Sequence, residues 1–203
     1  MNSRFAPEKF FDLSQILFAE IFDDVEYVWE VIPKILPYAK SKSNENKPLI
    51  GKNTIIKNNV VFEGSCVIGD NCTIGPNSYF REGIIIGDNV RIGSSVEIKN
   101  SIIMNNSSVP HLNYVGDSII GSNVLLGGGT LCANFRFDEK NITVKLNNKK
   151  YDTGLQKLGA IIGDYSKTAA GAVLNPGTLL EKQCIVFPQT KVFGYYPAGT
   201  VIK

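Results

Sequence analysis

The amino-acid sequence predicts a mainly β fold, a parallel β-solenoid with three short strands in each coil and a short α-helical cap at its N-terminus. Three features lead to this prediction. Large apolar residues recur at every sixth position, small or turn-forming residues follow them at fixed offsets, and the first 49 of the 203 residues lack the repeat but place apolar residues at helical spacing. Neither a helix, with period 3.6, nor a two-sided strand, with period 2, repeats every six residues.

The repeat of six runs without a miss from Ile50 to Ile98. Its positions are Ile50, Ile56, Phe62, Ile68, Ile74, Phe80, Ile86, Ile92 and Ile98. We expect each large residue to point into the solenoid, and the glycine, asparagine or aspartate that often follows to supply the left-handed backbone of a corner. Stacked coils then pair their strands in parallel and bury one continuous core.

The repeat resumes later and takes in the cysteines. Its later positions are Ile120, Leu126, Ile162, Thr168, Leu174, Leu180, Val186 and Val192. Cys66, Cys72 and Cys184 occupy the small inward position, and Cys132 occupies the large one. We therefore predict four inert core thiols, which suit a reducing compartment. The cysteines lack metal-ligand spacing, so no metal site is predicted.

Residues 1–49 are expected to form a helical cap and linker, and residues 50–203 the β-solenoid domain. Helical spacing relates four apolar residues, namely Phe10, Leu13, Leu17 and Ile21. A second helix is expected to begin at Asp23, Pro33 and Pro37 to break or kink it, and residues 40–48 to form a polar linker. We expect the helices to cover the open first coil, whose strand edges would otherwise be exposed. Docking of a partner or shaping of a substrate site is the alternative.

Two segments interrupt the repeat within residues 50–203. The first is 105–119: because Met104 and Ile120 are 16 residues apart, which is not a multiple of six, we expect the chain to leave the coil there, with Pro110 and His111 at the departure. The second, at about 135–158, contains "ITVKL" and "KKYDTG" on either side of "NN", a pattern typical of a hairpin. It carries five lysines, Lys140, Lys145, Lys149, Lys150 and Lys157. These either face solvent or contact a phosphate-bearing cofactor, from this chain or a neighbouring subunit.

Composition narrows the possible functions. The net charge of +2, from 21 basic and 19 acidic residues, is too balanced to indicate nucleic-acid binding. No apolar run approaches the roughly 20 residues needed to span a bilayer. Asp12 and Glu20 interrupt the apolar stretch near the N-terminus, which argues against a signal peptide. We expect a cytoplasmic protein without membrane association.

Several segments are more specific than the repeat. They are "REG" (81–83), "VEIKNS" (96–101), "VPHLNYVGDSIIG" (109–121), "GGGTLCANFRFD" (127–138) and "TGLQKLGAIIGD" (153–164). In this order they resemble the acetyltransferase domain of the bifunctional glucosamine-1-phosphate acetyltransferase / N-acetylglucosamine-1-phosphate uridylyltransferase family, and its archaeal sugar-phosphate nucleotidylyltransferase relatives. The resemblance implies a left-handed parallel β-helix of hexapeptide repeats and a homotrimer with each site between subunits. Residues 1–49 have no room for the family's nucleotidyltransferase domain, so that activity is not expected.

The resemblance also implies roles for individual residues. His111 matches the catalytic base, and an imidazole with a pKa near 6.5 suits removal of a proton from an amino-sugar amine. Arg81, Lys99 and Tyr114 match residues that bind the sugar phosphate; Arg81 and Lys99 stand three hexads apart and so stack in adjacent coils. Acetyl-coenzyme A, the expected co-substrate, has its contacts at Gly128, Asn134, Phe135 and Ala170. The family more usually has tyrosine at the position of Phe135.

One departure bears on the acceptor. Leu125 stands where the family has an asparagine that contacts the sugar, so the acceptor is expected to differ or to bind weakly. The sequence therefore predicts an acetyl-coenzyme A-dependent N-acyltransferase acting on an amino-sugar phosphate such as glucosamine 1-phosphate. The alternative is a non-catalytic module that binds a sugar nucleotide or a partner beside a separate nucleotidyltransferase. A zinc-dependent enzyme would need several histidines, and the chain has one.

Overall fold

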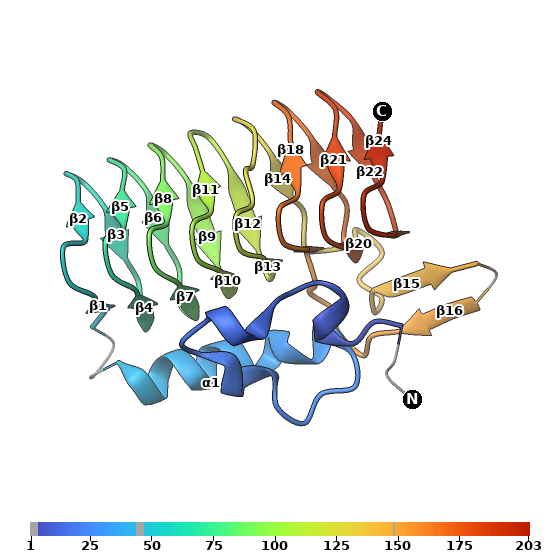
Figure 1. Cartoon of the computed structure of the whole chain (residues 1–203), viewed down its shortest axis with the longest axis horizontal. Helices are drawn as coiled ribbons and strands as arrows, with labels where there is room; N and C mark the ends of the chain where they lie inside the picture. The colour runs from blue at the N-terminus through green and yellow to red at the C-terminus, as the bar shows by residue number, and fades with distance from the viewer. Residues whose placement is uncertain (1–3, 44–46, 148) are drawn as a thin grey trace.

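Three walls of parallel strands enclose the core in the computed structural model, which describes residues 4–43, 47–147 and 149–203 (Figure 1). Wall A contains β1 (Leu49–Ile50), β4 (Cys66–Ile68), β7 (Ile84–Ile86), β10 (Ser101–Ile103), β13 (Ile119–Ile120), β17 (Ala160–Ile162), β20 (Thr178–Leu180) and β23 (Tyr195–Tyr196). Wall B contains β2 (Ile55–Ile56), β5 (Thr73–Ile74), β8 (Arg91–Ile92), β11 (Ser108–Val109), β18 (Lys167–Thr168), β21 (Ile185–Val186) and β24 (Val201–Ile202). Wall C contains β3 (Val61–Phe62), β6 (Tyr79–Phe80), β9 (Glu97–Lys99), β12 (Tyr114–Gly116), β14 (Leu131–Cys132), β19 (Val173–Leu174) and β22 (Lys191–Val192).

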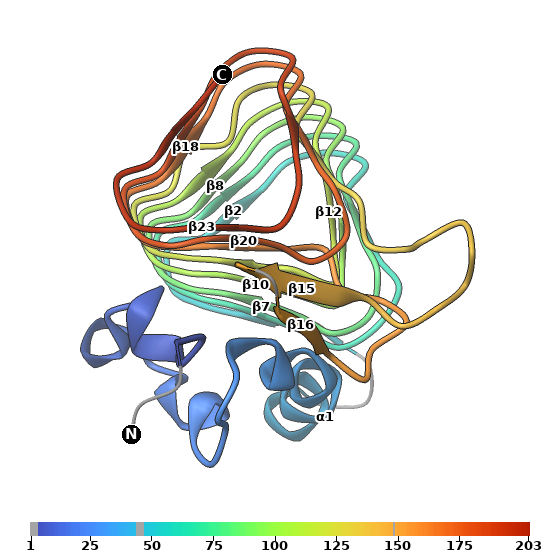
Figure 2. The same ribbon diagram turned by 90° about the vertical axis from the view of Figure 1, so that its right-hand side faces the viewer.

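The coils wind with a left hand, as the resemblance implied. Figure 2 looks along the solenoid from its C-terminal end, with wall A below, wall B at the upper left and wall C at the right. The chain passes from wall A to B to C, which is clockwise in this view, while successive coils approach the viewer. Clockwise rotation toward the viewer defines a left-handed helix, so the predicted fold is confirmed.

The predicted inward residues form the solenoid core. Ile68, Ile74, Phe80, Ile86, Ile92 and Ile98 all lie in one buried cluster, together with the four cysteines. The cysteines are unpaired, and burial raises the pKa of the Cys66 and Cys132 thiols to about 12. They are inert core thiols, as predicted. Asparagines at corners take positive φ, including Asn53, Asn71 and Asn89 at φ 57°.

The expected departure from the coil at 105–119 is wrong. β11 and β12 continue walls B and C through this segment, and Ile103 pairs with Ile120 without a gap. What changes is the corner between walls C and A, where the next inward residue comes five positions after Ile98 rather than six. The inward residues Val115 and Ile120 are likewise five positions apart, so this corner too is one residue shorter than the repeat of six. The two corners are therefore each one residue shorter than the repeat, and the chain does not leave the solenoid.

Residues 5–43 contain less helix than the sequence predicted. The first expected helix is instead a series of short 3-10 turns, at Pro7–Lys9, Leu13–Gln15 and Ala19–Phe22. Backbone groups there bond to the solenoid: the Phe10 carbonyl accepts from Asp164 N at 2.9 Å, and Asp12 N donates to the Asp164 carboxylate at 2.7 Å. These bonds replace the i to i−4 bonds of a helix.

The second expected helix also begins later than predicted. A 3-10 turn at Val28–Val31 leads into α1 (Ile32–Lys42), the α-helix of this segment. Pro33 lies in the first turn of α1, where a missing N–H costs little, and Pro37 lies inside the helix. The expected linker at 40–48 overlaps the end of α1, and its residues 44–46 lie outside the described residues.

The helical segment covers the flank of wall A and not the open first coil (Figures 1 and 2). The reason is that wall A is apolar on both faces. Ile85, Ile102, Ile119, Ile161 and Leu179 point outward and form a second buried core with residues of the segment, including Phe10, Trp29 and Ile35. Leu49 in β1 remains 49% exposed.

The predicted hairpin is present within the insertion. β15 (Thr143–Leu146) pairs antiparallel with β16 (Lys149–Asp152), with Val144 opposite Tyr151. Ile142, Val144 and Leu158 join the second core, so the insertion is anchored beside the N-terminal segment. None of the helices within the described residues is long and apolar enough to cross a membrane.

Candidate functional site

A cavity of about 300 Å³ lies against wall C. It is lined by Arg81, Lys99, Tyr114, Asn134, Phe135 and Lys157. Register explains the grouping, because Arg81 follows β6, Lys99 ends β9, and Gly116 of the next coil pairs with Lys99. The fold therefore brings together all three residues expected to bind the sugar phosphate and two of those expected to contact coenzyme A. We call this space the wall C cavity.

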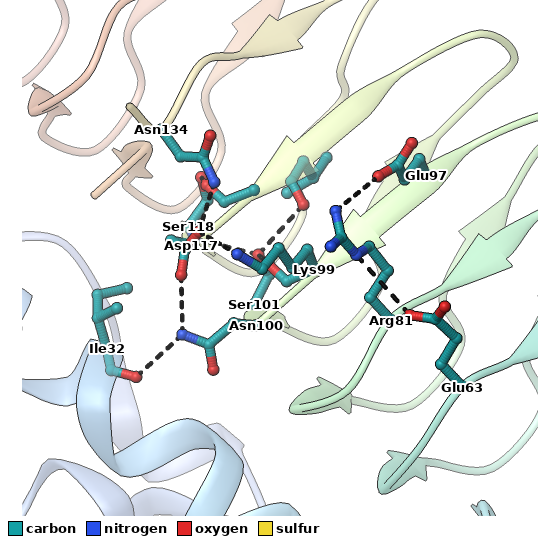
Figure 3. A network of polar contacts seen from close by, with 12 residues as sticks. Ile32, Glu63, Arg81, Glu97, Lys99, Asn100, Ser101, Asp117, Ser118 and Asn134 are labelled. Carbon is teal, nitrogen blue, oxygen red and sulfur yellow. Dashed lines mark hydrogen bonds and ion pairs between the residues drawn. The ribbon is translucent and has the colours of Figure 1, made fainter. Parts of the chain in front are cut away.

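Arg81 stands between two carboxylates. Its Nε lies 3.8 Å from Glu63 Oε2 and its Nη1 lies 3.4 Å from Glu97 Oε1 (Figure 3). The Arg81 side chain is 40% exposed, and ion pairs in such a setting contribute little to stability. The guanidinium is thus held in place by weak contacts and remains accessible to an anion in the cavity.

Lys99 is more buried than Arg81, at 19% exposure of its side chain. Its Nζ lies 3.7 Å from Asp117 Oδ2. Burial lowers the pKa of Lys99, the Asp117 carboxylate acts in the opposite direction, and nearby Lys157 lowers the pKa further. Cations that crowd one another in this way favour an added anion.

Lys157 is a cavity residue to which the sequence gave no single role. An antiparallel bridge between Phe135 and Lys157 holds the two edges of the insertion together beside the cavity. All five lysines of the insertion are exposed, Lys157 included. Solvation therefore fits all five, and Lys157 in addition lines the wall C cavity, where it can reach a phosphate.

Asp117 is a site residue that the sequence analysis missed, although it falls inside a quoted motif. Its side chain is 6% exposed and accepts from Asn134 Nδ2 and, at 3.1 Å, from Asn100 Nδ2 (Figure 3). Asn100 Nδ2 also lies 3.4 Å from the carbonyl oxygen of Ile32 in α1. The missing residue in the repeat after Val115 was the signal that could have revealed this corner.

Tyr114 and Asn134 meet over Gly116. A Cβ added to Gly116 would lie 2.6 Å from Tyr114 Oη and 2.7 Å from Asn134 Nδ2, so only glycine leaves room for both side chains. Tyr114 is half-buried; burial raises the pKa of its phenol, as do the Asp117 and Glu97 carboxylates. The phenol therefore stays protonated near neutral pH and can donate a hydrogen bond into the cavity.

His111 lies in the turn between β11 and β12, at the corner between walls B and C. Its ring is exposed and lies against Gly128 of the next coil, where an added Cβ would be 2.6 Å from His111 Nε2. Ala170 stands one coil further on, and Gly171 N donates to the Gly128 carbonyl at 2.9 Å. We call the line of His111, Gly128 and Ala170 the His111 ridge.

The ridge and the cavity lie at opposite ends of the wall C strands. His111 comes three residues before Tyr114 at the start of β12, whereas Lys99 ends β9. His111, Gly128 and Ala170 do not line the wall C cavity. Leu125 lies on wall B, 45% exposed, bridged to Ser108 and Lys167. Within the described residues, no group of three or more His, Cys, Asp or Glu side chains could hold a metal ion.

Sequence comparison finds related proteins over part of the chain. A family model described as the GMPPB C-terminal domain matches residues 56–192. A bifunctional sugar-1-phosphate nucleotidylyltransferase/acetyltransferase of Sulfurisphaera tokodaii is 43% identical over 82 residues, which cover 40% of this chain and 20% of that protein. The bifunctional protein GlmU of Methanocaldococcus jannaschii is 43% identical over 79 residues, 39% of this chain and 19% of that protein. The match spans about a fifth of the length of these relatives.

Solved structures give weaker matches. An Arabidopsis UDP-N-acetylglucosamine acyltransferase is 15% identical, with a TM-score of 0.43 over 79% of this chain and 65% of that one. The polysialic acid O-acetyltransferase OatWY is 15% identical, with a TM-score of 0.29 over 76% of this chain and 86% of that one.

Proposed function

Since the chain belongs to the family of the GMPPB C-terminal domain and, as its motifs predicted, is similar to bifunctional acetyltransferases, we propose that it is an acetyl-coenzyme A-dependent N-acyltransferase acting on an amino-sugar phosphate. Glucosamine 1-phosphate is the first acceptor to test. The observation that carries the proposal is the wall C cavity, where Arg81, Lys99 and Lys157 surround a space beside Tyr114. In this proposal residues 50–203 form the acyltransferase domain, with an insertion at about 135–158, and residues 1–49 an accessory segment.

The cavity binds the acceptor in this proposal. Arg81 and Lys99 hold the phosphate, Arg81 through its planar guanidinium and Lys99 as a point charge, and Lys157 completes the positive surroundings. Tyr114 lines the cavity and follows His111 by three residues in the chain, so its phenol can contact the sugar ring. The amine of the acceptor then faces His111.

His111 acts as the general base. It removes a proton from the acceptor ammonium, and the freed amine adds to the thioester carbonyl carbon. As the carbon–sulfur bond breaks, the second proton of the adduct nitrogen passes to the departing sulfur, which leaves the amide and the coenzyme A thiol. Gly128 and Ala170 fit the acyl donor because neither has a side chain that would keep it from the backbone of the ridge. At the wall C cavity, Asn134 and Phe135 supply a polar contact and an aromatic contact to the acyl donor.

A homotrimer with its sites between subunits completes the proposal. Leu125 matches a sugar-contacting position but lies on wall B, away from the wall C cavity of the same chain. Wall B of a neighbouring subunit facing wall C would bring Leu125 to the acceptor. Closed cyclic assemblies of this kind use one pair of complementary surfaces repeatedly.

A non-catalytic module is the second candidate function. Leu125, in place of the expected asparagine, favours it, because a lost amide leaves hydroxyl groups of the acceptor unpaired. In that case the wall C cavity binds a sugar nucleotide or a partner without turnover.

The deciding experiment measures thiol release from acetyl-coenzyme A in the presence of glucosamine 1-phosphate. Wild-type protein is expected to release thiol only with the sugar present. His111→Ala is expected to lower the rate by roughly 10²–10⁴ at an unchanged thermal midpoint. Absence of release with glucosamine 1-phosphate and with a panel of other amino-sugar phosphates would reject the enzyme and favour the binding module.

A further inference from the structure

We propose that Asp117 is a positioning residue that holds the phosphate-binding lysine and the acyl-donor asparagine in register and ties both to the N-terminal segment. This inference rests on the proposed function for the roles of Lys99 and Asn134. The arrangement of contacts around Asp117 is a property of the fold itself.

The location of Asp117 follows from the shortened corners of the solenoid. Asn100 and Asp117 occupy the corners between walls C and A at which a residue is missing, and both have positive φ, of 41° and 43°. Asp117 N donates to the Lys99 carbonyl at 2.8 Å, which stacks the two short corners. A short corner turns the Asp117 side chain toward the neighbouring residues of wall C.

Both carboxylate oxygens of Asp117 are engaged by these neighbours. Oδ2 accepts from Asn134 Nδ2 and lies 3.7 Å from Lys99 Nζ, while Oδ1 accepts from Asn100 Nδ2 (Figure 3). One buried anion therefore fixes a group expected to bind the acceptor and a group expected to bind the acyl donor. Charge-assisted hydrogen bonds of this kind are about twice as strong as neutral ones.

The N-terminal segment reaches the same group. A second cavity of about 370 Å³ lies between α1 and the solenoid, and Lys99, Asn100 and Asp117 line it opposite Ile32 and Leu36. Asn100 spans the gap by contacting both Asp117 and the Ile32 carbonyl. The family match begins at residue 56, so α1 lies outside the matched residues, although it borders the surroundings of Lys99.

The charges around Lys99 make the effect of Asp117 measurable. Asp117, Lys157 and Arg81 act on Lys99 directly, and Glu63 and Glu82 line cavities that it shares. Burial and Lys157 lower the pKa of Lys99, whereas Asp117 raises it. Removing the Asp117 charge therefore lowers the pKa of Lys99 further, and the lysine loses its proton at a lower pH.

Asp117→Asn is the variant that isolates the charge. Asparagine has the same size and tolerates positive φ. We expect KM to rise about tenfold for both glucosamine 1-phosphate and acetyl-coenzyme A, because the asparagine leaves one neutral acceptor oxygen for Lys99, Asn134 and Asn100. The increase in acceptor KM at basic pH is expected to begin at a lower pH than in wild type.

Asp164→Asn is the matched control. Asp164 is 1% exposed and accepts from Asp12 N and Ser122 N, outside the wall C cavity. It is expected to lower stability without moving either KM or the pH profile. If Asp117→Asn does not fold, Asn100→Gly, which keeps the positive φ and removes the link to Ile32, takes its place; wild-type values of both KM would then overturn the inference.

A second measurement needs no substrate. Acetylation of lysines by acetic anhydride, followed against pH by peptide mass spectrometry, reports the pKa of Lys99, with exposed Lys150 as internal reference. A midpoint that falls for Lys99 alone in Asp117→Asn supports the coupling, even if wild type shows no turnover and the proposed function fails. An unchanged Lys99 midpoint in a folded Asp117→Asn protein would overturn the inference, whatever the activity of wild type.

Discussion

At the scale of single residues, Gly128 of the His111 ridge and its neighbour Gly129 are required for different reasons. Gly128 has ordinary φ, but a side chain there would collide with the His111 ring. Gly129 has φ of +70° and open space around it, with its nearest atom outside the turn 4.0 Å from an added Cβ. Gly128 leaves room for the His111 ring, whereas Gly129 supplies the left-handed backbone of the turn.

This difference predicts opposite outcomes for two alanine substitutions. Gly128→Ala is expected to displace the His111 ring and lower kcat at least tenfold, with little change in the thermal midpoint. Gly129→Ala is expected to cost roughly 1 kcal/mol of stability through backbone strain and to leave kcat nearly unchanged. Steady-state kinetics and thermal unfolding of both proteins check the pair. Equal kcat in the two variants would remove His111 from the proposed mechanism.

At the scale of elements, the N-terminal segment owes its position to wall A. Each wall A strand presents an apolar residue outward as well as inward, as Ile85 and Ile86 do in β7. A sheet that is apolar on both faces must be covered on both. α1 packs on β4, β7 and β10, where it forms one border of the space beside Lys99.

The packing of α1 predicts a large loss of stability when it is weakened. Ile35 is fully buried in the second core, so Ile35→Ala is expected to lower the free energy of unfolding by about 2–5 kcal/mol. Leu17→Ala is the control, because Leu17 is 83% exposed and its loss should matter by less than about 0.5 kcal/mol. Urea unfolding followed by the fluorescence of buried Trp29 measures both. Similar values for the two variants would contradict the described packing.

At the scale of the whole molecule, the proposed trimer makes wall B of one subunit part of the site of another. Leu125→Asn introduces the amide that the sequence resemblance implies at this position, and it is expected to lower the KM for glucosamine 1-phosphate about tenfold. Ile55→Asn, on the same face of wall B and 52% exposed, should leave that KM unchanged. Light scattering is expected to give three times the 22.3 kDa mass of the chain. A monomer whose KM responds to Leu125→Asn would contradict a site between subunits.

The sequence by itself determined the coil. A repeat of six with glycine and asparagine at corners allows one way to bury its apolar residues, so Ile68, Phe80 and Ile98 could be assigned to the core without a structure. Arg81 and Lys99 could be placed side by side for a related reason: they stand three hexads apart, and residues separated by whole coils stack. Local spacing is sufficient wherever each coil repeats the one before it.

Only the tertiary structure decided the features that break the repeat. Residues 10–21 have helical spacing but form short 3-10 turns and no α-helix. At the start of this stretch the backbone groups of Phe10 and Asp12 bond to Asp164, which is 152 residues away from Asp12. From the sequence, the two shortened corners were interpreted as a point where the chain leaves the coil. Residue spacing alone cannot distinguish a coil that is one residue short from a loop that leaves the coil. Asp117 could not be given a role for the same reason: its partners Asn100, Asn134 and Lys99 meet only once two short corners are stacked. At residues 10–21 and at the shortened corners, contacts between residues far apart in the chain outweigh the local sequence pattern. Most of the polar contacts beside Lys99 depend on such long-range contacts.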